Sequence, residues 1–283
     1  MMQANDALRR IEEVLDAPQM TVADNPQAPR GNDVEFCDVR FTYEGAEHPA
    51  LDGVSFRVPA GSTVALVGPS GGGKTTAASL VPRFWDADSG SVLVGGVDVR
   101  EMDPHVLMDD VAFVFQNNRL FKSSILENVR VARPDATREQ VGEALSAAQC
   151  DDIIAKLPDG VDTIIGTRGT YLSGGEQQRI MLARAILKDA PIVVLDEATA
   201  FADPENERLI QGAFKRLAQG RTVIMVAHRL TTVVGADKIV VLDHGHVVEQ
   251  GSHAGLVASG GLYARMWADY QTAVSWKISK GVA

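Results

Sequence analysis

The sequence predicts an α/β protein with a parallel-sheet core, an antiparallel β subdomain and an inserted helical subdomain. The parallel core is predicted by three short apolar runs at 192–195, Thr222–Val226 and 238–242, which are typical of buried strands. A helical pattern at about 204–217 separates the first two runs. Strand, helix and strand at this spacing imply parallel pairing through right-handed crossovers.

The antiparallel subdomain is predicted by residues near the N-terminal end. Apolar and polar residues alternate at 34–43, and a second strand pattern follows at Leu51–Val58. Two further short runs, at 91–94 and 97–100, are joined by Gly95-Gly96, a strong hairpin-turn signal. These runs predict a β layer beside the strand at Thr63–Val67.

The helical subdomain is predicted by a change of period at about 118–180. Capping boxes begin at Ser124 and Thr137, and apolar residues then recur at helical spacing through 141–148. The pattern indicates a mostly helical insert before the strand at 192–195.

Composition excludes several classes of protein. Of the 283 residues, 45% are hydrophobic and the formal net charge is −10, which argues against a surface for nucleic acid or anionic membranes. Cys37 and Cys150 lack metal-ligand spacing and are expected to be buried thiols in a reducing compartment. No apolar stretch approaches the length of a membrane span and residues 1–17 do not fit a signal peptide, so the chain as given is expected to be soluble and cytosolic.

The chain contains a phosphate-binding loop of the form G-x-x-x-x-G-K-[ST] at Gly68-Pro69-Ser70-Gly71-Gly72-Gly73-Lys74-Thr75. Glycines let backbone N–H groups surround phosphates, Lys74 reaches the β- and γ-phosphates, and Thr75 can ligate Mg²⁺. The strand before the loop and a helix at 75–80 after it would direct a helix N-terminus at the phosphates. A glycine-rich turn without a ligand is the alternative, but Lys and Thr follow the last glycine as nucleotide binding requires. The motif therefore predicts a P-loop NTPase.

Two adjacent carboxylates, Asp196 and Glu197, end the apolar run that starts at Ile192. In strand geometry they point to opposite sides, so Asp196 can hold Mg²⁺ while Glu197 acts as general base toward water. The alternative is that the pair only ends the strand and caps the next helix.

With the string Leu172-Ser173-Gly174-Gly175-Glu176, these motifs resemble the nucleotide-binding domain of ATP-binding cassette (ABC) transporters. The resemblance runs from about 34 to 271. It implies an ABC ATPase with ATP and Mg²⁺ as cofactors, which powers the transport of a substrate across a membrane by ATP-dependent dimerisation.

The resemblance also implies roles for individual residues. Tyr43 matches the aromatic that stacks on adenine, although its alternation with Phe41 equally allows a core position. The implied catalytic residues are Glu197, His228, Gln116 and Lys74, and the implied metal ligands are Thr75, Gln116 and Asp196. The implied ATP-binding residues are Tyr43, Gly68, Pro69, Ser70, Gly71, Gly72, Gly73, Lys74, Thr75, Thr76, Ser173, Gly174, Gly175 and Asp203.

Ser173 has two compatible interpretations. Ser173 and Glu176 form an ordinary capping box before a helix. The resemblance implies in addition that Ser173 and Gly175 face the γ-phosphate bound to an opposite subunit. The expected partners are therefore another ABC nucleotide-binding domain, in a homodimer or heterodimer, and a transmembrane domain, with no nucleic acid.

Less prominent segments resemble exporter-type half-transporters, namely 83–90, 120–128, 251–253 and 261–263. The expected domains are a connector helix and linker from a membrane domain at 1–32, the ABC domain at 33–271 with its helical subdomain at about 118–180, and a C-terminal tail at 272–283. The expected location is the cytoplasmic face of the membrane, through an attached or associated membrane domain. The segment 198–207 resembles siderophore-linked half-transporters, which act in iron uptake.

Four positions depart from the exporter pattern. Ala200 stands where the family has a serine at the subunit interface, and Thr167 stands where it usually has an acidic residue. Asn117 and Asn118 differ from the acidic residue that is common after the glutamine. Two alternatives of function remain: a half that clamps ATP without hydrolysis in a heterodimer, and an ABC ATPase with no role in transport.

Overall fold

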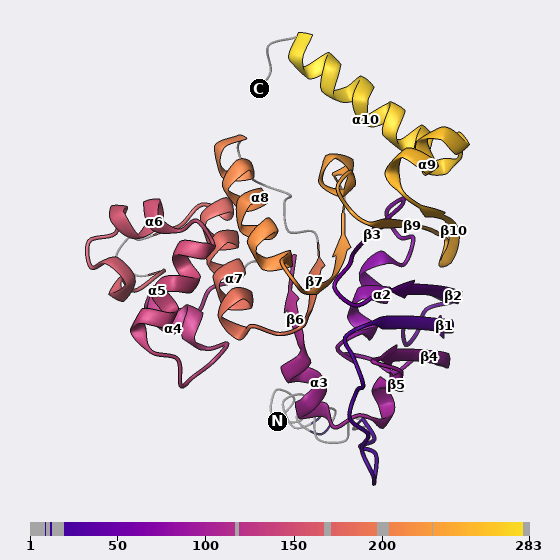
Figure 1. Cartoon of the computed structure of the whole chain (residues 1–283), viewed down its shortest axis with the longest axis horizontal. Helices are drawn as coiled ribbons and strands as arrows, with labels where there is room; N and C mark the ends of the chain where they lie inside the picture. The colour runs from indigo at the N-terminus through magenta and orange to yellow at the C-terminus, as the bar shows by residue number, and fades with distance from the viewer. Residues whose placement is uncertain are drawn as a thin grey trace.

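The computed structural model of the 283-residue chain describes residues 9, 12, 20–116, 119–166, 171–196, 204–227 and 229–279. The side chains of residues 204, 205 and 273–279 lie outside that description. Within the described residues, two sheets lie side by side and a group of helices flanks the larger one (Figure 1).

The larger sheet has six strands in the order β10-β9-β3-β8-β7-β6. Five of them pair in parallel, and β10 joins the edge antiparallel to β9. Its strands are β3 (Thr63–Val67), β6 (Val111–Val114), β7 (Ile192–Asp196), β8 (Thr222–Val226), β9 (Lys238–Asp243) and β10 (His246–Gly251). The predicted parallel core is thus confirmed, and its apolar strands are buried because the smaller sheet and α2 cover one face and helices cover the other.

The smaller sheet is antiparallel, in the order β2-β1-β4-β5, as the sequence predicts. Its strands are β1 (Val34–Phe41), β2 (Leu51–Val58), β4 (Ser89–Val94) and β5 (Val97–Asp98). Its inner face packs on the larger sheet and on α2 (Lys74–Leu80) in one hydrophobic core.

Two details of the smaller sheet differ from expectation. Tyr43 lies beyond the end of β1, and the strand expected at 97–100 turns at Val99 into a 3₁₀ helix, η1 (Val99–Glu101), because the Asp98 carboxylate accepts a hydrogen bond from the Arg100 N–H.

The helical subdomain packs on the opposite face of the larger sheet, at the left of Figure 1. It comprises α4 (Ile125–Arg130), α5 (Arg138–Ala147), α6 (Asp151–Lys156), η2 (Gly160–Asp162) and α7 (Gly174–Lys188), with α8 (Pro204–Ala218) beside α7. The guanidinium of Arg179, 1% exposed, joins these helices through Asp152 on α6 and Asn206 on α8. Its hydrogen bonds to Asp152 lower the pKa of that carboxyl.

The remaining elements were not predicted from the sequence. They are α3 (Pro104–Asp110), η3 (Leu230–Val233), β10, α9 (His253–Ser259) and α10 (Leu262–Ser279). The Glu249 carboxylate on β10 accepts hydrogen bonds from the backbone N–H groups of Leu262 and Tyr263, and so caps α10. α10 projects from the body of the molecule and runs across the boundary expected between 271 and 272 (Figure 1).

The two cysteines differ in burial. Cys150 is fully buried, as expected, and desolvation raises the pKa of its thiol to about 12. Cys37 is only partly buried, contrary to expectation, because β1 shifts register beside it where Asp38 adopts a left-handed backbone conformation.

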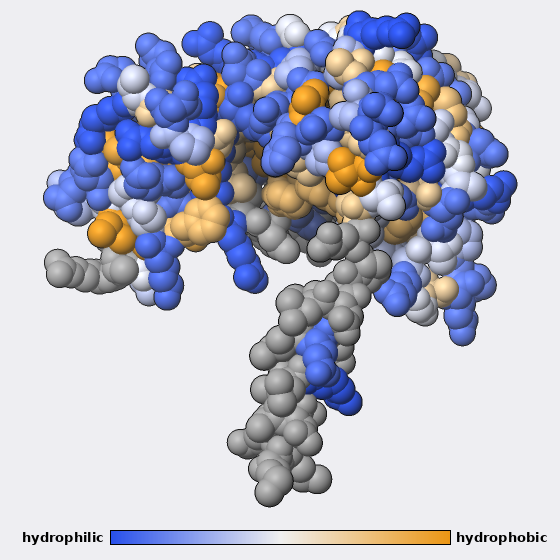
Figure 2. All heavy atoms as spheres, turned by 90° about the horizontal axis from the view of Figure 1, so that it is seen from below, coloured by the Kyte–Doolittle hydropathy of each residue, from blue (hydrophilic) through white to orange (hydrophobic). Residues whose placement is uncertain are grey.

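Hydrophilic side chains predominate on the face seen in Figure 2, and hydrophobic ones occur there in small separate patches. Among the helices that the structure describes, none combines the length and the apolar character that a membrane crossing requires.

Candidate nucleotide-binding site

The glycine-rich loop joins β3 to α2 at the carboxyl edge of the parallel sheet. Gly68 and Gly73 have φ angles of 142° and 94°, a region that residues with a side chain rarely adopt. A Cβ atom at Gly68 would lie 1.9 Å from the carbonyl oxygen of Leu242, and one at Gly73 would lie 2.5 Å from that of Ala50. The loop is therefore closed tightly against β9 and the start of β2, and only glycine fits at these two positions.

Lys74 and Thr75 follow the loop in the first turn of α2. The Lys74 side chain is 4% exposed, and its Nζ donates hydrogen bonds to the carbonyl oxygens of Gly68 (3.0 Å) and Pro69 (2.7 Å). The ammonium thus lies over the same loop whose amides would surround phosphate. A concentration of N–H groups and positive charge at a helix N-terminus is suited to binding an anion.

A hydroxyl and a carboxylate meet beside the loop. The Thr75 hydroxyl donates to Oδ1 of Asp196 at 3.0 Å, although the two residues are 121 positions apart. Asp196 ends β7 and is 5% exposed. Two oxygen donors at a phosphate-binding loop are the ligands that Mg²⁺ prefers when it also binds phosphates, so these residues fit that ion.

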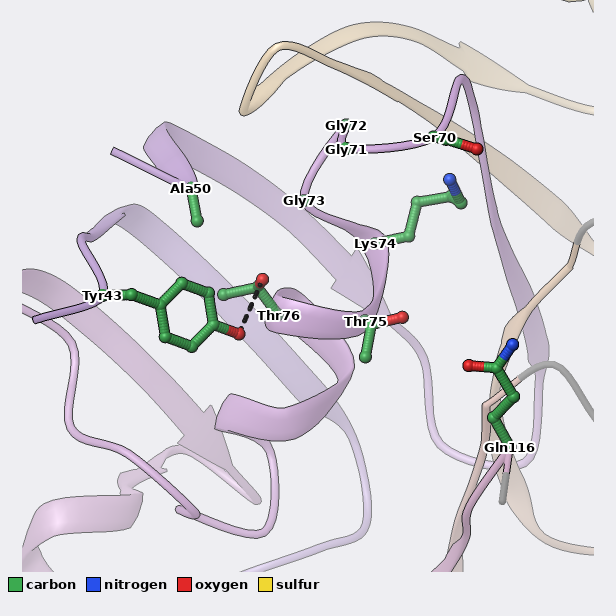
Figure 3. Close-up of a pocket in the computed structure, with 10 residues that line it drawn as sticks. All are labelled: Tyr43, Ala50, Ser70, Gly71, Gly72, Gly73, Lys74, Thr75, Thr76 and Gln116. Carbon is green, nitrogen blue, oxygen red and sulfur yellow. Dashed lines mark hydrogen bonds between the residues drawn. The ribbon is translucent and has the colours of Figure 1, made fainter. Parts of the chain in front are cut away.

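A cavity of about 370 Å³ opens along the loop (Figure 3). Its lining comprises Tyr43, Ala50, Ser70, Gly71, Gly72, Gly73, Lys74, Thr75, Thr76 and Gln116. Gln116, just beyond β6, lies across the cavity from Thr75. The structure therefore brings together most of the residues that the resemblance implies for ATP and Mg²⁺. Ala50 is the lining residue that sequence reasoning missed, and no sequence signal marks it.

Tyr43 lies at the other end of the cavity (Figure 3). Its hydroxyl is 3.1 Å from Oγ1 of Thr76, and its ring, 37% exposed, is perpendicular to those of Phe41 and Trp85. Tyr43 is thus an exposed aromatic beside the phosphate loop rather than a core residue.

Ser173, Gly174 and Gly175 do not line this cavity. They form the N-terminus of α7, where the predicted capping box is present: Ser173 Oγ accepts from the Glu176 N–H, and the Glu176 carboxylate accepts from the Ser173 N–H. Ser173 and Gly174 are exposed, so a second molecule can reach them. Glu197, Asp203 and His228 lie outside the described residues.

A second cavity of about 390 Å³ lies between the larger sheet and the helical subdomain. Its lining is mostly apolar, with Phe113, Phe115 and Phe121 among its side chains, and three cations border it: Arg119, Arg184 and Lys188. Desolvation lowers the pKa values of Arg184 and Lys188. One of its lining residues, Phe115, directly precedes Gln116 in the sequence.

Comparison with known proteins places these features in one family. The family model described as ABC transporter matches residues 51–200. The chain is 46% identical over 265 residues to the mycobactin import ATP-binding/permease protein IrtA of Mycobacterium tuberculosis, covering 92% of this chain and 31% of that protein. It is 47% identical over 253 residues to the ATP-dependent lipid A-core flippase of Burkholderia orbicola, covering 86% of this chain and 42% of that protein.

A solved structure, that of a bacterial Atm1-family ABC exporter with ATP bound, matches with a TM-score of 0.85 and 39% identity. The match covers 95% of this chain and 47% of that one. The chain thus spans 31% to 47% of the length of these three proteins. The matched family, the two-sheet fold and the loop geometry agree, and the chain belongs to the ABC transporter family, whose ATPase domain it contains.

Proposed function

We propose that this chain binds MgATP in the cavity along the glycine-rich loop and hydrolyses it as one half of a pair of such domains, to power transport across a membrane. The observation that carries the proposal is the 3.0 Å contact between Thr75 and Asp196 at the loop that Lys74 covers. Phosphoryl transfer from a Mg²⁺-nucleotide requires a carboxylate, a hydroxyl and an ammonium group close to the phosphates. All three lie beside the glycine-rich loop here.

The residues proposed to hold Mg²⁺ are Thr75, Asp196 and Gln116. When bound, the ion would neutralise charge on the phosphate oxygens. Gln116 is included because it faces Thr75 across the cavity.

The chain's own groups then have distinct tasks. Lys74 and the amides from Ser70 to Thr76 bind the phosphates, and Tyr43 stacks on the base. Glu197 accepts the proton of the attacking water, and His228 contacts the γ-phosphate. The assignments of Glu197, His228 and Asp203 rest on the sequence pattern alone.

The pairing proposal is supported by the position of Ser173, Gly174 and Gly175. These residues form a helix N-terminus, which favours a negative charge, yet they lie outside their own domain's cavity. In the proposed assembly they cover the γ-phosphate held by another ABC domain, identical or homologous.

A membrane domain is the other proposed partner. Residues 1–32 would connect to it, 33–271 would form the ABC domain and 272–283 a tail, with the assembly at the cytoplasmic face of the membrane. The apolar second cavity, which Phe115 lines, would receive a segment of that membrane domain. The relatives named for mycobactin import and for lipid A-core flipping are 46% and 47% identical to this chain, so the ATPase domain does not specify the cargo.

The test is ATPase activity with Mg²⁺ in the parent and in Lys74→Ala and Glu197→Gln. Loss of general-base assistance is expected to slow Glu197→Gln by about 10² to 10⁴-fold, and Lys74→Ala is expected to lose ATP binding. Lys215→Ala and Glu143→Gln, the same changes at exposed positions on α8 and α5, serve as controls and should keep the parent rate. A parent that neither binds nor hydrolyses MgATP would contradict the proposed function, and equal measurable rates for the parent and Glu197→Gln would contradict the general base.

A further inference from the structure

The loop between α2 and β4 is fixed from its inner side by Arg83. This side chain is 5% exposed, and its Nε and Nη2 donate to the Asp86 carboxylate at 2.6 and 3.0 Å. Nη2 also donates to the carbonyl oxygen of Thr21 at 2.8 Å. Arg83 has a φ of 57°, so the backbone reverses here, and the bidentate pair with Asp86 holds the three-residue turn in shape.

The next residue, Phe84, anchors the same loop on the other side. Its ring stacks on Phe115 with 5.7 Å between centroids, and it packs at 5.2 Å against Phe113. With Arg83 and Phe84 both held, the loop presents Trp85 outward on a rigid support.

Trp85 is 42% exposed, which is unusual for a large aromatic held this firmly. Its ring lies 5.5 Å from that of Tyr43 at an interplanar angle of 86°, and Phe41 is perpendicular to Tyr43 at 4.8 Å. Perpendicular aromatic pairs are stabilising because a ring edge is positive and a ring face is negative. Tyr43 is thus held by Phe41, by Trp85 and by its own hydroxyl at Thr76.

We propose that Trp85 is a positioning residue for the nucleotide base: it holds the Tyr43 ring in the orientation that stacks on the base, and the Arg83–Asp86 pair holds Trp85. The inference rests on the proposed stacking role of Tyr43. Trp85 acts through Tyr43, so it contributes to affinity for the base and not to binding of the triphosphate or to the chemical step.

The experiment compares two ligands by calorimetry in the presence of Mg²⁺: a non-hydrolysable ATP analogue and inorganic tripolyphosphate. Trp85→Leu removes the aromatic pair with Tyr43, so the Tyr43 ring is no longer held for stacking. We expect binding of the analogue to weaken about 2- to 10-fold, the range that the loss of one aromatic pair corresponds to. Binding of tripolyphosphate should not change. In ATPase assays the KM for ATP should rise while kcat stays near the parent value.

Three further variants keep the test decisive. Trp85→Phe retains an aromatic edge and should keep most of the affinity for the analogue. Trp267→Leu makes the same substitution in α10, and its affinity for the analogue should equal that of the parent. Tyr43→Ala should weaken the analogue at least as much as Trp85→Leu does. If Tyr43→Ala has no effect, the stacking role in the proposed function fails.

The positioning role itself has separate contrary results. It is overturned if Tyr43→Ala weakens the analogue and Trp85→Leu does not. It is equally overturned if Trp85→Leu weakens tripolyphosphate as much as the analogue, or if Trp85→Phe loses as much affinity as Trp85→Leu, since either result indicates general damage to the loop.

Discussion

At the scale of single residues, the candidate site depends on a few short contacts between parts of the chain far apart in sequence. Thr75 and Asp196 meet because β3 and β7 end at the same edge of one parallel sheet. Parallel sheets of this kind bind ligands beyond the carboxyl ends of their strands. Leu242, near the end of β9 at this edge, and Ala50, just before β2 of the smaller sheet, both lie against the glycine loop.

Asp196→Asn tests the metal assignment. The amide can still accept the Thr75 hydrogen bond, so the fold should be kept while the negative charge toward Mg²⁺ is lost. We expect the Mg²⁺ concentration for half-maximal ATPase activity to rise about 10- to 100-fold, the range of an interaction with a charged group. Asp162→Asn, at an exposed ion pair in the helical subdomain, is the matched control. An unchanged Mg²⁺ requirement in Asp196→Asn would exclude Asp196 as a ligand.

Gly73→Ala and Gly71→Ala separate steric clash from backbone strain. Both glycines have positive φ, at 94° and 79°, which costs about 1–2 kcal/mol for alanine. Only at Gly73 would the new Cβ meet the Ala50 carbonyl oxygen, and such overpacking costs about 1–3 kcal/mol more. Denaturant unfolding should therefore show a larger loss of stability for Gly73→Ala. Equal losses would mean that the loop is not pressed against β2.

At the scale of elements, the structure shows which patterns are locally determined. The capping boxes at Thr137 and Ser173 could be predicted because both partners lie within one helical turn, and both form. The box predicted at Ser124 forms only in part: Ser124 caps α4, but the Glu127 carboxylate accepts a hydrogen bond from Arg130. The start of α3 has an equally local signal, because the Asp103 side chain caps the helix and Pro104 is its first residue. β5 is shorter than expected because of an equally local contact, the hydrogen bond from the Arg100 N–H to the Asp98 carboxylate.

Other features could not be predicted, because distant residues determine them. In β10, half-buried positions alternate with exposed ones, so its sequence carries little apolar pattern, and pairing with β9 makes it a strand. The position of Tyr43 past the end of β1 follows from contacts with Trp85 and Thr76, and the second cavity is lined by residues from 112 to 188. Glu197, Asp203 and His228 remain predictions from the motif.

Ser173→Asp tests the α7 N-terminus at this scale. Aspartate caps helices as well as serine does, so the free energy of unfolding should change by no more than about 0.5 kcal/mol. A carboxylate facing a γ-phosphate is repelled, so ATP hydrolysis should fall at least about tenfold. Thr137→Asp, the same change in the α5 capping box, should leave both quantities near the parent values. Full activity in Ser173→Asp would contradict the proposed contact with phosphate.

At the scale of the whole molecule, the proposed function requires one domain to contain two unlike halves of a site. The phosphate loop, Lys74 and the Thr75–Asp196 pair lie together at the edge of the parallel sheet. The N-terminus of α7 is exposed and belongs to the helical subdomain. Two copies arranged head to tail would place each half beside the complementary half of the other.

The most direct test measures ATPase activity per molecule at saturating MgATP over a dilution series, with size exclusion reporting the fraction of paired domains. The account predicts that activity per molecule rises with concentration in step with that fraction and is lost where only single copies remain. Activity per molecule that is constant down to concentrations at which all copies are single would contradict it.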